Sequence, residues 1–199
     1  MVSAPSCVII PRSPFLCHPW SDSMGPLYDY GFTLQPALIL AAINETDTDD
    51  IVAEKMKVIS RYLTKVLTWR VWNHWMISQS MMEAPIYNLC KAVRGMSLGE
   101  LQDFFKTDPI ELPELNNAPT LNQQNKYRVR VMLALITEIV ASESGESDYI
   151  LNHKDIEVEH IWSDHYDQHM DECVDSNDFA GVRNNLGDLL VLPKSFNAS

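Results

Sequence analysis

The residues best suited to chemistry lie between Ile156 and Cys173, in the segment IEVEHIWSDHYDQHMDEC. The segment starts with a short alternation of apolar and acidic residues, in which Glu159 directly precedes His160. A neutral imidazole can take a proton from water and a carboxylate can hold a divalent cation, so this pair has the groups that metal-assisted hydrolysis requires. The same pair also fits a histidine at a strand end beside surface acids, and spacing alone favours that simpler interpretation.

Three further residues of metal-binding type follow at intervals of four: His165, His169 and Cys173. On an α-helix they would share one face, and together they could bind zinc. No fourth ligand is evident, and the same spacing fits a solvated helix face. Zinc binding is therefore an alternative, to be recognised by stoichiometric zinc in the purified protein.

Two short strands are expected to position these residues. The alternation in DIEVEHIW predicts a strand with Ile156, Val158 and His160 on one face and the glutamates on the other. A second apolar run, LGDLLVLP, follows an Asn/Gly turn and predicts the other strand. Residues 146–199 are thus expected to form a small acidic module that contains both strand and helix.

The preceding region, residues 31–145, is predicted to be helical. Ser97 and Glu100 in SLGE form a capping box, which predicts a helix start at that point and an end before TDPIELPEL. Trp69, Trp72 and Trp75 form a spaced stripe that favours packing over base stacking. Apolar residues at steps of three and four predict further helices over Phe32–Ile43, about Ile51 to Met82, and Asn125–Ala141.

Composition limits the classes of function. The net charge of -12 includes twelve acids against two bases from Glu146 to Asp188, so this chain alone is expected to bind DNA weakly. Four cysteines without CxxC pairing, and prolines throughout the Pro- and Ser-rich irregular lead of residues 1–30, indicate a reducing, cytoplasmic setting. No apolar run reaches the roughly 18 to 20 residues of a membrane-spanning helix, so no membrane association is expected.

The pair of motifs VEHIW and RNNLGDLLVLPKSFN resembles the C-terminal nuclease domain of GmrSD-type modification-dependent restriction endonucleases, an HNH branch of the His-Me finger nucleases. The resemblance is strongest over Ile156–Asn197, and the helical region is similar in pattern only. It implies a mainly α protein with a ββα-metal module. It also implies hydrolysis of DNA phosphodiester bonds with Mg²⁺ or Mn²⁺ in a bacterial defence system.

The resemblance also implies roles for individual residues. His160 would be the general base that activates water, Glu159 a metal ligand, and Asn197 the third motif residue beside the metal. The middle HNH position falls on Asp188, where the family usually has an asparagine that helps to hold the histidine loop. An aspartate can accept hydrogen bonds but cannot donate them as an amide does.

Asp188, in place of the usual asparagine, and a missing helix favour a competing interpretation. The ββα finger needs a helix after its second strand, whereas the sequence ends two residues past Asn197, so the finger is expected to be truncated. No GxxxxGK[ST] loop is present. The nucleotide-dependent N-terminal part of the family is therefore expected to be a domain or subunit that this chain lacks. The competing interpretation is a catalytically inactive helical fragment that packs against that domain.

Overall fold

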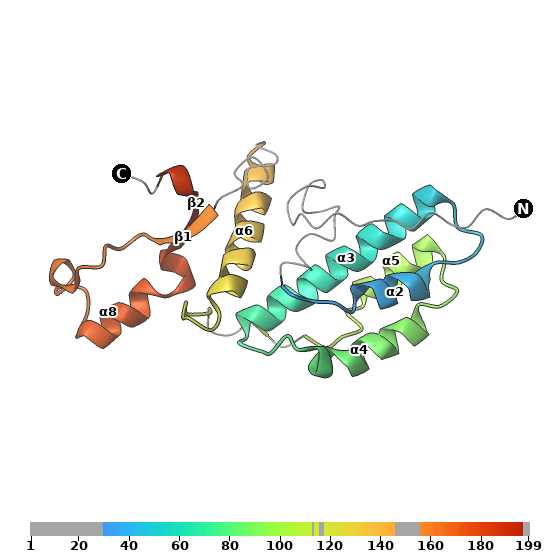
Figure 1. Cartoon of the computed structure of the whole chain (residues 1–199), viewed down its shortest axis with the longest axis horizontal. Helices are drawn as coiled ribbons and strands as arrows, with labels where there is room; N and C mark the ends of the chain where they lie inside the picture. The colour runs from blue at the N-terminus through green and yellow to red at the C-terminus, as the bar shows by residue number, and fades with distance from the viewer. Residues whose placement is uncertain (1–29, 113, 116–117, 146–155, 197–199) are drawn as a thin grey trace, which may run out of the picture.

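The computed structural model describes residues 30–112, 114–115, 118–145 and 156–196. These residues are mainly helical with a small antiparallel sheet, as predicted (Figure 1). The lead before Tyr30 and the motif residue Asn197 lie outside the described residues. The longer elements are α2 (Gln35–Ala42), α3 (Asp49–Trp72), α4 (Gln79–Ala92), α5 (Leu98–Lys106), α6 (Lys126–Glu143), β1 (Ile156–His160), α8 (Ser176–Arg183) and β2 (Leu189–Pro193).

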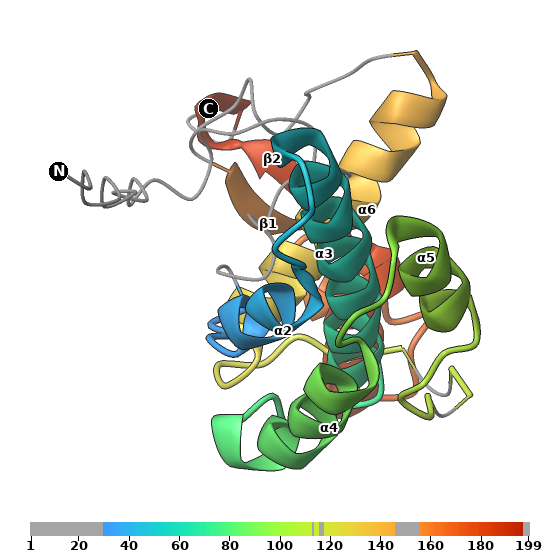
Figure 2. The ribbon, with the colours of Figure 1, turned by 90° about the vertical axis from the view of Figure 1, so that its right-hand side faces the viewer.

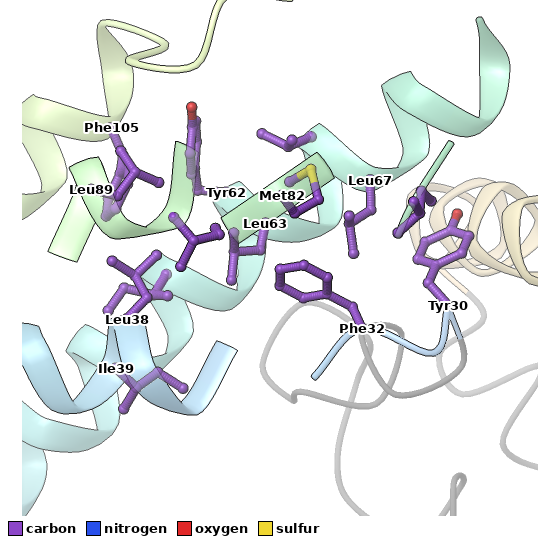
Figure 3. Packing of buried hydrophobic residues seen from close by; sticks show 14 of the residues in the cluster. Tyr30, Phe32, Leu38, Ile39, Tyr62, Leu63, Leu67, Met82, Leu89 and Phe105 are labelled. Atoms are coloured by element: carbon purple, nitrogen blue, oxygen red, sulfur yellow. The ribbon is translucent and has the colours of Figure 1, made fainter. Parts of the chain in front are cut away.

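The helical body is organised around α3. Helices α2 and α5 pack against α3, and α4 packs against α2 (Figure 2). Leu63 and Leu67 of α3 are fully buried and lie beside Phe32, which precedes α2 (Figure 3). Tyr62 stacks on Phe105 with ring centroids 4.4 Å apart, which fixes α5 against α3. None of the helices in the described part of the chain is long and apolar enough to span a membrane.

The single helix predicted from about Ile51 to Met82 is wrong, because the chain forms α3 and α4 with a break between them. Asn73 ends α3 by donating from its side-chain amide to the carbonyl of Trp69, 3.0 Å away. His74 then adopts a left-handed φ of 56°, and Ser78 caps α4 by accepting from the Met81 N–H. Histidine adopts this backbone region more readily than most residues, so the break needs no glycine or proline.

The break also divides the predicted tryptophan stripe. Trp69 and Trp72 are half-buried on α3, and Trp72 packs against the core of the body. Trp75 lies in the loop after α3, is 45% exposed and has the Arg70 guanidinium 5.2 Å from its ring centre. Trp72 therefore packs as predicted, Trp69 is partly buried on the same helix, and Trp75 does not belong to the helix.

The other predicted helices are confirmed. The Ser97 hydroxyl accepts from the Glu100 N–H, and the Glu100 carboxylate accepts from the Ser97 N–H at 2.8 Å, so the capping box begins α5. Helix α5 ends at Lys106, before the proline-containing loop. The predicted helix over Asn125–Ala141 is α6, displaced by one or two residues at its ends.

Helix α6 joins the helical body to the C-terminal module. Its Val131 and Met132 side chains belong to the core of the body. On another face of the same helix, Val129, Leu133 and Ala134 pack against the β1–β2 hairpin in a second apolar cluster. Figure 1 shows α6 standing between the hairpin and the other long helices. The β1–β2 hairpin is thus held against the body through α6, and Leu186, just before β2, also contacts both clusters.

Candidate active site

The two predicted strands pair as an antiparallel hairpin. Val158 lies opposite Val191, and His160 lies opposite Leu189 at the end of the ladder. Ile156 and Val158 contact the apolar cluster on α6, so the predicted inward face of β1 is confirmed. His160 is on the same face of the strand as these two residues. It lies where the strand ends and is half-buried.

The imidazole of His160 is held by a residue that the sequence analysis did not single out. Its Nε2 lies 3.1 Å from Oδ1 of Asn184, which follows α8. The Asn184 amide also donates from Nδ2 to the carbonyl of Ala180, 2.8 Å away. A signal was present in the pattern, since Asn184 stands within the same RNNLGD motif, but the 24-residue separation from His160 hides the contact.

Asp188 stabilises the chain just after His160. Its carboxylate oxygens lie 3.2 and 3.3 Å from the backbone N–H of Trp162, which donates to them. The backbone carbonyl of Asp188 accepts from the Ile161 N–H at 2.8 Å. Asp188 is buried, and its carboxylate acts here only as an acceptor. This contact does not need the N–H donors of an amide side chain.

Glu159 does not share the environment of His160. It is half-buried and lies opposite Leu190 in the hairpin. Because successive side chains of a strand point to opposite faces of the sheet, Glu159 lies on the other face from His160. Its carboxylate is a hard oxygen donor of the kind that Mg²⁺ and Mn²⁺ prefer. Asn197, the other predicted ligand, lies outside the described residues, among which no group of three or more His, Cys, Asp or Glu side chains could hold a metal ion.

The segment between β1 and α8 is not the helix that a zinc face would require. Only Tyr166–Gln168 forms a short 3₁₀ turn, and His165 lies before it on the surface. His169 instead stacks on Trp162 with ring centres 4.1 Å apart, and Phe179 of α8 packs against both rings. A regular helix would place Trp162 and His169 about two turns apart, so it would separate the stacked rings.

Cys173 is also unsuited to the predicted zinc face. Its side chain is buried, and burial, followed by the negative charges of Asp178 and Glu172, raises the pKa of the thiol. Zinc binds the thiolate, which these surroundings disfavour. His165, His169 and Cys173 therefore do not share a helical face, which was the condition for the zinc alternative.

One basic side chain links the segment that follows β1 to the end of α8. Arg183, at the end of α8, donates from Nε to the carbonyl of Trp162 at 3.3 Å. Its Nη1 lies 3.6 Å from the carboxylate of Asp164. Arg183 and Asp188 therefore hold Trp162 by its carbonyl and its N–H respectively, which fixes the backbone two residues after His160.

Comparison of the chain with models of known protein families, with curated protein sequences and with solved structures found no match.

Proposed function

We propose that the chain is the catalytic part of a metal-dependent DNA endonuclease of a bacterial restriction system. The observation that carries the proposal is the position of His160 at the end of an antiparallel hairpin, with its ring held by Asn184. A general base must keep one orientation while its substrate changes, and contacts from two elements provide that constraint. The resemblance of VEHIW and RNNLGDLLVLPKSFN to HNH nucleases supplies the reaction class.

In the proposed reaction His160 removes a proton from a water molecule. The water oxygen attacks the phosphorus atom of a DNA phosphodiester, and the bond from phosphorus to the leaving oxygen breaks. Asp188 and Arg183 fix the backbone after His160, so the imidazole keeps its position relative to the phosphate. Precise placement matters because a shift of about 1 Å costs on the order of a hundredfold in rate.

Glu159, together with Asn197, would hold the divalent cation. Mg²⁺ often uses only one or two carboxylates and completes its coordination with water and substrate phosphate, so a ligand set this small is chemically adequate. When bound, the cation supplies positive charge for the phosphate oxygens in the transition state. The chain itself has a net charge of -12, so grip on DNA would come from a partner domain of the kind that precedes this region in the resembling family.

The experiment is nicking of supercoiled plasmid by the purified chain in Mg²⁺ or Mn²⁺, with unmodified and modified DNA. Glu159→Gln is expected to lower the rate at least about tenfold, because even outer contacts of metal sites contribute this much. Glu157→Gln is the matched control, since the Glu157 side chain lies on the same face of β1 as that of Glu159 and its carboxylate lies 3.5 Å from the ammonium of the exposed Lys194. Equal activity of both variants would rule out Glu159 as a ligand.

A non-catalytic interaction fragment is the second candidate function. The observation that favours it lies on α6, where Ile136, Ile139 and Val140 are exposed within about two turns after the residues that pack on the hairpin. An apolar surface of this kind suits contact with the partner domain expected from the family. No nicking of either DNA in either metal would favour this candidate over the nuclease.

A further inference from the structure

The orientation of the Asn184 amide determines which nitrogen of His160 carries a proton. The carbonyl of Ala180 can only accept hydrogen bonds, so the Asn184 atom 2.8 Å from it must be the donor Nδ2. The acceptor Oδ1 therefore faces Nε2 of His160, at 3.1 Å. An amide oxygen cannot donate, so Nε2 must supply the proton of this hydrogen bond.

The reverse arrangement places two acceptors against each other. If Nδ1 carried the proton, the lone pair of Nε2 would face Oδ1 of Asn184. Rotation of the amide by half a turn would relieve that contact, but it would set Oδ1 against the carbonyl of Ala180. Both alternatives place two acceptors against each other in a half-buried site, whereas the Nε2–H form gives each of these two contacts one donor and one acceptor.

Asn184 is itself held by backbone contacts on two sides. Its N–H donates to the carbonyls of Ala180 and Val182 at the end of α8. Its carbonyl accepts from the N–H of Leu121 at 2.7 Å, which ties it to the segment before α6. The backbone of Asn184 is therefore fixed relative to both α8 and the segment before α6. Its side-chain oxygen can thus hold the imidazole ring of His160 in one orientation.

We propose that Asn184 is a positioning residue that keeps the neutral ring of His160 in its Nε2–H form and leaves Nδ1 to take the proton from water. The assignment of Nδ1 as the reacting atom rests on the proposed nuclease function, whereas the positioning does not. The contact serves both states of the ring, because Nε2 remains a donor after Nδ1 is protonated. Asn184 thus stabilises the imidazolium formed in the reaction as well as the base.

The test is nitrogen-15 NMR of the full chain, at about pH 8 to 9, where an ordinary histidine is neutral. Two-bond nitrogen–hydrogen correlations identify the protonated nitrogen of His160. Isolated histidine already prefers the Nε2–H form, so the decisive signal is slow solvent exchange of that proton. Asn184→Ala is expected to accelerate the exchange by about tenfold, the value of one hydrogen bond. A wild-type ring protonated at Nδ1 would overturn the proposal.

The same variant is tested for nicking. Asn184→Ala should lower kcat by roughly 10- to 100-fold with KM little changed, as expected for loss of an orienting contact. Asn177→Ala, which changes an exposed asparagine of α8, the helix that Asn184 follows, is the matched control and should change neither quantity. Retained cross-strand contact between Val158 and Val191 shows that the hairpin of the variant is folded.

The two proposals fail in different ways. If the wild type does not nick DNA but the Nε2 proton is protected, the nuclease function and the role of Nδ1 fail while the positioning stands. If the wild type nicks DNA but Asn184→Ala leaves both kcat and proton exchange unchanged, the positioning role fails while the nuclease function stands.

Discussion

Asp188 stabilises the end of β1 through a contact that requires only an acceptor. Both of its carboxylate oxygens face the N–H of Trp162, and its side chain is buried. An amide oxygen in the same place would also accept from that N–H. The aspartate therefore holds the backbone next to His160, whereas the imidazole itself contacts Asn184.

Substitutions at Asp188 separate this acceptor function from charge. Asp188→Asn should change the free energy of unfolding by less than about 1 kcal/mol, because an acceptor oxygen remains. Asp188→Ala leaves the Trp162 N–H without its acceptor and should cost about 1 to 3 kcal/mol. Urea unfolding followed by circular dichroism measures both. Equal losses in the two variants would show that the negative charge matters instead.

Lys55 connects the loops at one end of the helical body. Its side chain is fully buried on α3, and its Nζ donates to the carbonyls of Ala42 and Met96, each at 2.8 Å. The same Nζ lies 2.7 Å from the carboxylate of Asp47, in the loop before α3. One ammonium group therefore holds together the end of α2, the start of α3 and the turn before α5.

Removal of this ammonium should destabilise the body strongly. Lys55→Met removes the ammonium from the nearly buried Asp47 carboxylate and from two carbonyls, which leaves that charge without its counter-charge, and the expected cost is about 3 to 5 kcal/mol in urea unfolding. Lys57→Met, on the same helix, removes a lysine from an exposed pair with Glu54 and should cost less than about 1 kcal/mol. Similar losses for the two lysines would contradict the assigned role of Lys55.

The same contacts make the stability of the body depend on pH. Hydrogen bonds from the Asn44 N–H and then from Lys55 lower the pKa of the Asp47 carboxyl below its ordinary value. A lowered pKa in the folded state means that Asp47 contributes stability above roughly pH 4, and that this contribution is lost as the pH falls further. The stability difference between wild type and Asp47→Asn should therefore shrink in acid, whereas the difference for the exposed Asp103→Asn should stay small throughout.

Local elements were predictable from the sequence where local chemistry determines them. The capping box at Ser97 and the alternation in IEVEH fixed a helix start and a strand face, because each depends on residues within a few positions. The break at Asn73 and His74 was missed because neither residue is a strong breaker by type. The contact of Asn184 with His160 was missed because it depends on how α8 returns to the hairpin, which no local pattern contains.

At the scale of the whole molecule, α6 belongs to both apolar clusters. Met132 packs in the body, and the next residue, Leu133, packs on the hairpin. A helix shared in this way should couple the folding of the two parts. The position of His160 relative to the body then depends on packing more than 20 residues away in sequence.

This coupling predicts a single cooperative transition. Met132→Ala should cost about 2 to 5 kcal/mol, as expected for a buried large-to-small substitution. Because α6 is shared, the amide of Val191 in β2 should exchange faster in this variant, although Met132 does not belong to the cluster that contains Val191. Native-state hydrogen exchange measures this effect. Unchanged protection at Val191 would show that the hairpin folds independently of the body.

The most direct test of the nuclease proposal compares two histidine variants in plasmid nicking with Mg²⁺ or Mn²⁺. His160→Ala should lower the nicking rate by at least about a hundredfold, the lower range for loss of a general base. His165→Ala removes an exposed histidine from the same module and should retain the wild-type rate. Wild-type nicking that His160→Ala preserves, or no nicking of modified and unmodified DNA by the wild type, would contradict the account.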